Sequence, residues 1–501
     1  MTNTRVTLIL ASLLSIRNID GKAEMKRPFC FIAVFLISGV LAGEYISSVY
    51  FLAFFLAAAA AASGVLMLKQ KCGAAMLLPA AFVIGLVLAG NAAGGLENED
   101  IQSLGSLRSR AVVERISKNY GGQRITARVK SIEVGDVSIH TDFQAFVYIK
   151  DAYAGKSGDI VEFNGVFLPP REKTQEGYDE RLYFGIKNID YKVYTGSLGF
   201  TGEREGEIKY LLLRIRDGCM SVYDKIMPPE EAGILKAFIA GDKSYMSGYM
   251  LNLFRNAGLS HILAVSGLHV SIFSVTFFWL LNEVLGLDRR KTAGIVTVFV
   301  ICYTVIVGGS PSCMRAAISS VISLFGIIIF KESDALNSLA IGVLVLVGLN
   351  PLVLYDIGFQ MSFVASFFII TAFKASESKA LAMVFAAVSL FPLTAYYYNE
   401  VILTGIISSF LAVPFCGYVV GFGILSGLAG LFSTALAEFF GGVVFVVIKY
   451  FEMVSYFADK AGFLKFNPGT PHILGMLCFY AALLFFLFAV KCLRLKFKRE
   501  K

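Results

Sequence analysis

The stretch Gly-Leu-Ser-His-Ile-Leu-Ala-Val-Ser-Gly-Leu-His-Val occupies positions 258–270 and decides the fold class of this 501-residue chain. Its two serines and two histidines lie in an apolar run that continues to Leu281, which is long enough to span a bilayer. A polar side chain in hydrocarbon costs free energy unless it faces protein or water. Bent backbone at membrane depth is tolerated only where protein or a wet cavity satisfies the freed groups. The stretch therefore predicts a polytopic membrane protein with a hydrated or tightly packed path at this helix.

The composition supports that prediction, because 56% of the residues are hydrophobic and the chain holds 44 Phe and 47 Gly. A bilayer core needs about 20 apolar residues per helix. By this measure we expect about 12 spans: three at the amino end, a polar insert, and nine more. The apolar stretches lie near 28–43, 47–67, 74–92, 258–281, 292–309, 312–330, 336–355, 357–373, 380–398, 401–421, 432–457 and 472–490. The glycine-rich stretch 401–431 is open to a second interpretation, a re-entrant segment.

Basic residues predict the orientation, because cytoplasmic loops carry an excess of Lys and Arg. Lys26 and Arg27 precede the first span, and Arg289 and Arg290 lie in a later loop. The tail after the last span carries six Lys or Arg residues against Glu500 alone. We therefore expect both termini in the cytoplasm of a multi-pass cell (inner) membrane protein, with the polar insert on the extracytoplasmic side.

The insert at 96–205 has a different character from the rest of the chain. Its short runs alternate at strand period, which predicts a small β-barrel of the OB type. Residues 108–130 hold seven basic residues and one acid, Glu114. A contiguous basic face of this kind is able to hold a phosphate backbone, and an ordinary solvated strand face is the alternative. The basic residues are Arg108, Arg110, Arg115, Lys118, Arg124, Arg128 and Lys130.

The remaining boundaries follow from composition. Residues 25–95 are expected to form a three-span membrane anchor, 206–230 an amphipathic helix at the membrane surface, and 231–501 a channel bundle. Residues 1–24 are expected to be a non-native or disordered extension. No cysteine falls within 96–205, so a disulfide framework is excluded there.

Several motifs in chain order resemble the ComEC-type competence proteins. The resemblance rests on Gly241-Asp242-Lys243-Ser244, the stretch at 258–270, Arg315-Ala316, Asp334 with Asn337, and Asp356 followed by Gln360. It covers the chain from about Met25 onward. The resemblance implies an inner-membrane channel that imports single-stranded DNA in natural transformation. It also implies three partner proteins, namely a separate nuclease, a DNA receptor and a cytoplasmic helicase, beside the lipid bilayer.

Many full-length relatives in that family carry a metallo-β-lactamase-like domain, and this chain departs from them. It has four histidines and neither a His-x-His-x-Asp-His cluster nor a Cys-x-x-Cys pair. We therefore expect no enzyme activity, no metal site and no cofactor in this polypeptide.

A polyanion crosses a bilayer only along a path that offers water, hydrogen-bond donors and positive charge. Arg315 is the candidate phosphate contact, and an ion pair with Asp242, Asp334 or Asp356 is its structural alternative. Asn337 and Gln360 either line the path or hold helices together. Tyr303 is a candidate for base stacking, although most aromatics here face lipid or neighbours. Asp242 is typical of a helix cap.

His261 and His269 are eight residues apart, about 80° around an ideal helix, so both side chains are candidates for one cavity. Ser266 and His269 share a helix face, which admits a nucleophile–base pair. A packed hinge in the pore, with Gly258 and Gly267 supplying the close approach, is the simpler interpretation.

Three functions remain open from the sequence. The DNA conduit predicts a basic sheet face that opens toward a cavity near Arg315. A secondary transporter for small solutes requires paired broken helices in two related halves, and the sequence shows no internal repeat. An intramembrane hydrolase requires Ser266 and His269 within hydrogen-bond reach.

Overall fold

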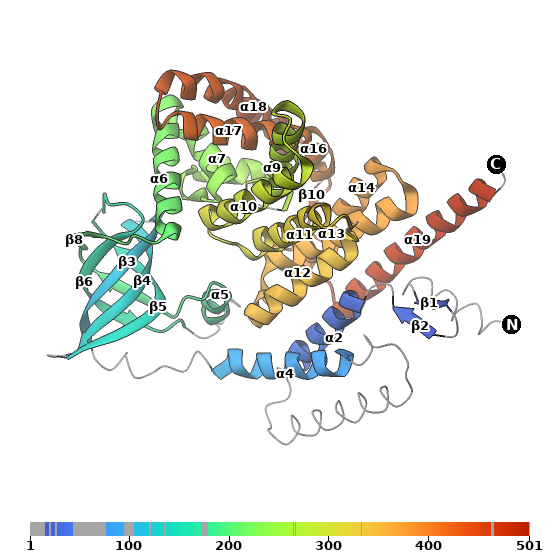
Figure 1. Ribbon diagram of the computed structural model, residues 1–501, viewed down its shortest axis with the longest axis horizontal. Coiled ribbons are helices and arrows are strands. Elements are labelled where there is room, and N and C mark those ends of the chain that lie inside the picture. Colours follow the sequence, from blue (N-terminus) through green and yellow to red (C-terminus); the bar gives the residue numbers. More distant parts are fainter. Residues whose placement is uncertain are drawn as a thin grey trace.

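The protein consists of a β-sheet domain and a larger helical bundle, which helix α6 (Ile208–Ile226) joins (Figure 1). This is a computed structural model. It describes residues 16–19, 22–25, 28–43, 77–94, 105–119, 122–134, 137–151, 153–171, 179–263, 265, 267–331, 333–461 and 465–499. The predicted span at 47–67 and the candidate residue Ser266 lie outside these ranges. Within the predicted extension 1–24 the structure describes β1 (Ile16–Ile19) and most of β2 (Lys22–Met25), which pair with each other.

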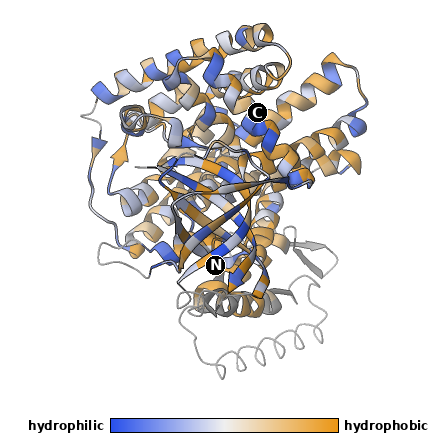
Figure 2. Cartoon of the chain, turned by 90° about the vertical axis from the view of Figure 1, so that its left-hand side faces the viewer, coloured by the Kyte–Doolittle hydropathy of each residue, from blue (hydrophilic) through white to orange (hydrophobic). Residues whose placement is uncertain are grey.

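The sheet domain has six strands in the order β3-β4-β5-β7-β6-β8, and β3 also pairs with β6. Strand β5 pairs with β7 in parallel, and the other ladders are antiparallel. Alternate residues such as Val113, Ala127 and Val147 are buried in the interior, as the period-2 pattern of the sequence predicts. Polar and apolar residues consequently alternate along these strands (Figure 2). The strands and the small helix between them are β3 (Ser106–Asn119), β4 (Gly122–Val134), β5 (Val137–Ile149), β6 (Asp159–Leu168), α5 (Glu180–Ile186), β7 (Tyr191–Thr195) and β8 (Gly199–Arg204).

A register shift in β3 reverses the direction of its side chains. Leu107, Ala111 and Val113 are buried in the sheet interior, and strict alternation would send Arg115 there too. The β3–β4 register instead shifts between Val113 and Arg115, and Ile116 packs against the interior. A bulge of this kind re-aims the side chain beside it. Arg115 therefore points out of the sheet toward the bundle.

The bundle begins after α6 and runs to the end of the described chain. Two more helices, α2 (Pro28–Gly43) and α4 (Leu77–Gly94), pack against each other at the amino end. The other bundle elements are α7 (Pro229–Ala240), η3 (Lys243–Tyr245), α8 (Gly248–Asn256), α9 (Gly267–Trp279), η4 (Leu280–Val284), α10 (Arg289–Val307), α11 (Pro311–Ile328), α12 (Ala335–Leu349), η5 (Pro351–Tyr355), α13 (Ile357–Ser376), α14 (Lys379–Ser389), α15 (Phe391–Tyr398), β9 (Val401–Ile402), α16 (Thr404–Ala412), η6 (Val413–Phe415), α17 (Cys416–Ala429), α18 (Thr434–Lys460), β10 (Lys465–Phe466) and α19 (Ile473–Arg499).

Eight segments among the described residues are long and apolar enough to cross a membrane, fewer than the 12 expected from the sequence. Two predicted spans, 28–43 and 336–355, coincide instead with shorter apolar helices, Phe29–Ala42 and Ala335–Leu349. The stretch at 401–431 forms one candidate span, Thr404–Ala429, which η6 interrupts. Apolar residues dominate these helices (Figure 2). The eight segments are Gly267–Val284, Arg289–Val307, Pro311–Ile328, Ile357–Ser376, Lys379–Tyr398, Thr404–Ala429, Thr434–Lys460 and Ile473–Arg494.

The span expected at 258–281 begins later, at Gly267, because turns occupy the chain from Ala257 to Leu263. Gly258 has φ +72° and ends α8, where its N–H and that of Leu259 bond back to the last helical turn. A Cβ at Gly258 would lie 2.6 Å from the Cα of Gly405 on α16. The motif at 258–270 is therefore a compact turn wedged against α16, followed by a helix.

Candidate functional site

A cavity of about 2680 Å³ extends from the sheet domain into the helical bundle. Its walls come from β3–β5, the α5–β7 loop, helix α6, the turn at 240–244, and helices α9 to α16. Pockets for small molecules usually measure about 300–1,000 Å³. The cavity is thus larger than a pocket shaped around one small solute.

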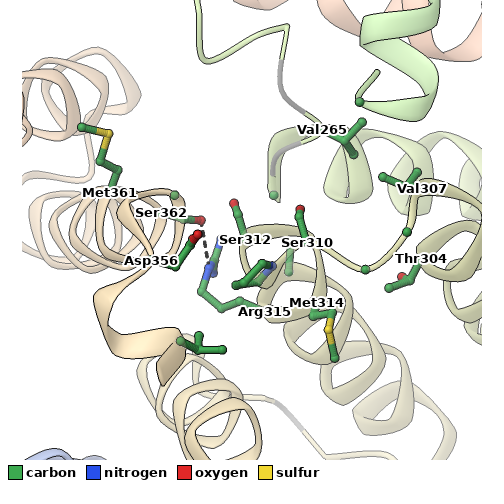
Figure 3. A pocket seen from close by; sticks show the side chains of 18 of the residues that line it. Val265, Thr304, Val307, Ser310, Ser312, Met314, Arg315, Asp356, Met361 and Ser362 are labelled. Carbon is green, nitrogen blue, oxygen red and sulfur yellow. Dashed lines mark hydrogen bonds between the residues drawn. The ribbon is translucent and has the colours of Figure 1, made fainter. Parts of the chain in front are cut away.

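Arg315 reaches into this cavity from the first turns of α11 (Figure 3). Its Nε donates a hydrogen bond of 3.1 Å to the Oγ of Ser362 on α13, and the residue is 7% exposed. Asp356 lies beside this pair in Figure 3. Among the described residues, however, no carboxylate lies within ion-pairing distance of the guanidinium. Arg315 is therefore held by a neutral hydroxyl, and no acid in the described part of the chain cancels its charge.

Gly267 explains how Arg315 fits between α9 and α11. A Cβ at position 267 would lie 2.6 Å from Nη2 of Arg315 and 3.2 Å from the Cβ of Ala316. Atoms at 2.6 Å overlap, so any larger residue would displace the guanidinium. The glycine thus supplies the space that Arg315 occupies.

Hydroxyl groups line the bundle part of the cavity around Arg315. They come from α9, α11, α12, α13 and α16 and from the turn before α11. The buried Oγ of Ser319 has no hydrogen-bond partner among the described residues. The hydroxyl-lined part of this cavity is expected to hold water, since one water occupies only about 30 Å³ and finds polar partners there. The serines that these elements contribute are Ser271, Ser310, Ser312, Ser319, Ser323, Ser338, Ser362, Ser366 and Ser409.

The two histidines of the motif lie in different environments. His261 lines the cavity and its Nδ1 lies 3.0 Å from the carbonyl of Gly258. His269 is fully buried in α9, where its ring packs edge-on against Phe238 at 5.6 Å. The helical spacing that would align them does not apply, because His261 lies in the turns before α9.

Three of the other predicted path residues are packed between elements. Tyr303 is 4% exposed, stacks on Phe273 at 5.1 Å, and is 3.5 Å from the carbonyl of Ile239. Gln360 accepts a hydrogen bond from the hydroxyl of Tyr397 and donates to the carbonyl of Leu354.

Asn337 is the third of these packed residues. Its side-chain oxygen lies 3.8 Å from the sulfur of Cys30 on α2. These three residues connect elements, and the described lining of the cavity does not include them.

The motif aspartates cap helices. Asp242 accepts from Ser244 N at the start of η3, Asp334 from Leu336 N and Asn337 N at α12, and Asp356 from Phe359 N at α13. Asp242 and Asp356 also line the cavity, next to Gly241 and Gly358. Burial of the carboxyl group raises the pKa of Asp356 above its ordinary value.

The seven basic residues of 108–130 do not share one environment. Four of them pair with acids: Arg108 with Glu162 and Glu133, Arg110 with Glu203, Arg128 with Glu114 and Asp142, and Lys130 with Asp142. Lys118 lies over the ring of Tyr245. Arg115, Arg124 and Arg128 line the cavity.

Arg115 attaches the sheet domain to the bundle. Its Nη2 donates a hydrogen bond of 2.6 Å to the carbonyl of Val307 at the end of α10. Burial lowers the pKa of Arg115 to about 10. Beside it, Ser117 Oγ donates to Asp242 Oδ2 at 3.4 Å.

A second contact between the sheet domain and the helical bundle lies at the end of α12. Asn350 Nδ2 donates to the carbonyl of Gly185 at 2.9 Å and to Oδ1 of Asn188 at 3.0 Å. The cavity includes residues of both contacts in its wall. The sheet domain is therefore held at two places beside the cavity.

Sequence reasoning missed several cations of the lining. Lys187 comes from the turn after α5, and Lys243 and Arg255 lie near the turn at 257–263. Burial lowers the pKa of Lys243. Lys187 and Arg255 belong to no periodic pattern, so only the folded chain brings them to the cavity.

Comparison with known proteins places these residues in a wider context. The model of a family described as "Competence protein" matches residues 238–492. The chain is 24% identical over 473 residues to ComE operon protein 3 from Bacillus subtilis (strain 168), a match that covers 93% of this chain and 58% of that protein. It is 34% identical over 61 residues to competence protein ComA from Neisseria gonorrhoeae, covering 12% of this chain and 9% of the other. The chain therefore spans less than two thirds of either relative's length. No solved structure matches it.

Proposed function

Because the chain belongs to the competence protein family, we propose that this multi-pass membrane protein is a conduit that imports single-stranded DNA during natural transformation. Arg315 carries the proposal. It lines a large cavity that reaches from the sheet domain into the bundle, and Ser362 holds its Nε without cancelling its charge. A guanidinium held in this way is suited to contact phosphates that pass along the cavity.

The energetics favour a role for Arg315 beyond structure. An arginine costs about 2.5–3.5 kcal/mol at the centre of a span on insertion scales, and this figure is an upper bound for Arg315 in the first turns of α11. A single hydrogen bond to a charged group returns about 1.5–3 kcal/mol. The serine hydroxyl supplies a hydrogen bond but no opposite charge, and a passing phosphate would add that charge.

The sheet domain fits the same function. Its pairing order β3-β4-β5-β7-β6, with the added β3–β6 ladder and a parallel β5–β7 pair, supports an OB-type domain. We place this domain on the extracytoplasmic side and both termini in the cytoplasm, following the distribution of basic residues. In this proposal the polypeptide carries out no chemical step. Any nuclease, DNA receptor or helicase is a partner protein.

Uptake of labelled DNA tests the conduit. A transformable strain that lacks its own homologous protein is complemented with the wild type, Arg315→Gln or Arg315→Lys. We expect the wild type to restore uptake and Arg315→Gln to lower it about ten-fold or more, because it loses one charged phosphate contact. Lysine keeps the charge but cannot reproduce the fork of donors, so Arg315→Lys should be intermediate.

Arg290→Gln is the matched control, because this arginine lies over Phe330 and is exposed. Equal membrane levels of all variants must be checked by immunoblot. Full uptake with Arg315→Gln would overturn the role of Arg315. Equal uptake in the deletion strain with and without the complementing wild-type protein would count against the conduit itself.

A further inference from the structure

The outer face of the sheet domain carries a cluster of aromatic and basic side chains at the edge of the cavity. Tyr148 on β5 and Tyr194 on β7 are partners in the parallel ladder, and their rings stack at 5.2 Å with an interplanar angle of 20°. Tyr194 is 50% exposed. Two residues earlier on the same face of β5, Phe146 packs against Phe184 of α5.

Two cations accompany these rings. The guanidinium of Arg124, on the neighbouring strand, lies 4.8 Å from the ring centroid of Phe146 and interacts with the hydroxyls of Tyr148 and Tyr183. The Nζ of Lys187 lies 4.4 Å from the ring centroid of Tyr183 and donates to its hydroxyl. We call Arg124, Tyr148, Tyr183, Lys187 and Tyr194 the tyrosine platform.

The charges of the platform are available to a ligand. In the described part of the chain, neither Arg124 nor Lys187 lies within 4.0 Å of a carboxylate. Glu180 is neutralised by Lys192, and Asp356 acts on Lys187 only at longer range. Four of the other basic residues of this domain are paired with acids, as described above.

The platform also leads into the cavity. Arg124, Phe146 and Lys187 belong to the cavity wall. Two of the three tyrosines contact these wall residues from outside the described lining, and the third stacks on one of those two. A cross-strand aromatic pair can stabilise a sheet by itself. That role alone would not require two unneutralised cations beside the rings, nor a place next to a large opening.

We infer that the tyrosine platform binds unpaired bases of single-stranded DNA by stacking, while Arg124 and Lys187 hold the flanking phosphates, and so delivers the strand to the cavity. The inference rests on the proposed function and names where the strand first binds. Stacking on aromatic rings accepts any base, as import of arbitrary sequence requires. Duplex DNA keeps its bases paired and is excluded from this mode.

Fluorescence anisotropy with the purified full chain in detergent tests the inference. The probes are a labelled 20-nucleotide dT strand, an abasic strand of the same length and charge, and a 20-base-pair duplex. The wild type should bind the dT strand at least about ten-fold more tightly than the abasic strand, the gain expected from stacking one base. Tyr148→Ala/Tyr194→Ala should abolish this ratio and leave the affinity for the abasic strand unchanged.

Other variants separate stacking from structure. Tyr148→Phe/Tyr194→Phe keeps the rings and should keep the ratio. Arg124→Gln/Lys187→Gln should weaken binding of both the dT and the abasic strand and lower the dependence of affinity on salt. Phe200→Ala removes a similarly exposed aromatic beside Arg204 on β8 and should change nothing. If the double alanine variant does not fold, Tyr194→Ala alone should still lower the ratio.

Equal binding of dT and abasic strands by the wild type would overturn the platform, as would a ratio that survives the loss of both rings. Arg315→Gln, which tests the conduit, should leave the ratio unchanged because Arg315 lies in the bundle. A wild type that shows the ratio but no uptake would refute the conduit and keep the platform. A wild type that restores uptake but binds the dT and abasic strands equally would refute the platform and keep the conduit.

Discussion

Gly267 and Arg315 occupy one space, because a side chain at 267 would begin 2.6 Å from the guanidinium of Arg315. The position of the arginine therefore depends on a residue of a different helix. Ser362, from a third helix, fixes the other side of the group through Nε. Three helices thus set the direction of one cation in the cavity.

Gly267→Ala is predicted to act through Arg315. The new methyl group should push the guanidinium from Ser362 and lower DNA uptake to the level of Arg315→Gln. The double variant should be no worse than either single one, because both remove the same contact. Gly442→Ala is the control, since a Cβ there meets nothing within 4 Å. Additive losses of uptake in the double variant would contradict the prediction.

Arg115→Met should loosen the sheet domain from the bundle. The methionine keeps much of the apolar volume but loses the hydrogen bond to the carbonyl of Val307. We expect the contact to weaken by about 1.5–3 kcal/mol. Hydrogen exchange should rise at residues 307–310 and 241–244. Arg110→Met removes only an exposed pair with Glu203 and should cost about 0–1 kcal/mol; equal exchange in both variants would argue against the attachment.

Tyr303→Phe should leave both stability and uptake nearly unchanged. The hydroxyl is 3.5 Å from its acceptor, so the bond is weak, and the ring is buried against Phe273. Tyr303→Ala should lower the free energy of unfolding by about 3–5 kcal/mol through the cavity it leaves. Uptake per folded molecule should stay constant. A well-folded alanine variant with low uptake would instead show that Tyr303 contacts the strand.

Asp356→Asn is predicted to change how stability depends on pH. Burial raises the pKa of Asp356 above its ordinary value of 3.8, so the folded protein holds this proton more tightly than the unfolded chain does. Wild-type stability should therefore fall, relative to Asp356→Asn, as pH rises from 3.8 to the raised pKa, and the difference should then stay constant. Asparagine preserves the cap at α13. Denaturation of both proteins in detergent across this range measures the effect, and parallel curves would refute it.

The apolar runs and the alternating insert allowed the two bodies of the fold to be predicted from the sequence. The cost of an arginine in a span predicts Arg315 as a path residue, and Arg315 lies in the cavity wall. His269 and Tyr303 are also polar residues in apolar runs, yet both are packed in the structure. The hydrophobicity of the surrounding sequence does not distinguish a cavity wall from a contact between helices. The first bundle span begins later than position 258 because turns occupy Ala257 to Leu263, and the apolar character of this segment does not distinguish a packed turn from a helix. No sequence pattern predicts that Lys187 lines the cavity.

The attachments at Arg115–Val307 and Asn350–Gly185 have a mechanical consequence. They fix the sheet domain to the ends of two different helices, α10 and α12. A domain fastened at one point swivels when it is pulled, but one fastened at two resists that rotation. Tension on a strand gripped by the sheet would accordingly pass into α10 and α12, and so toward the helices that flank Arg315.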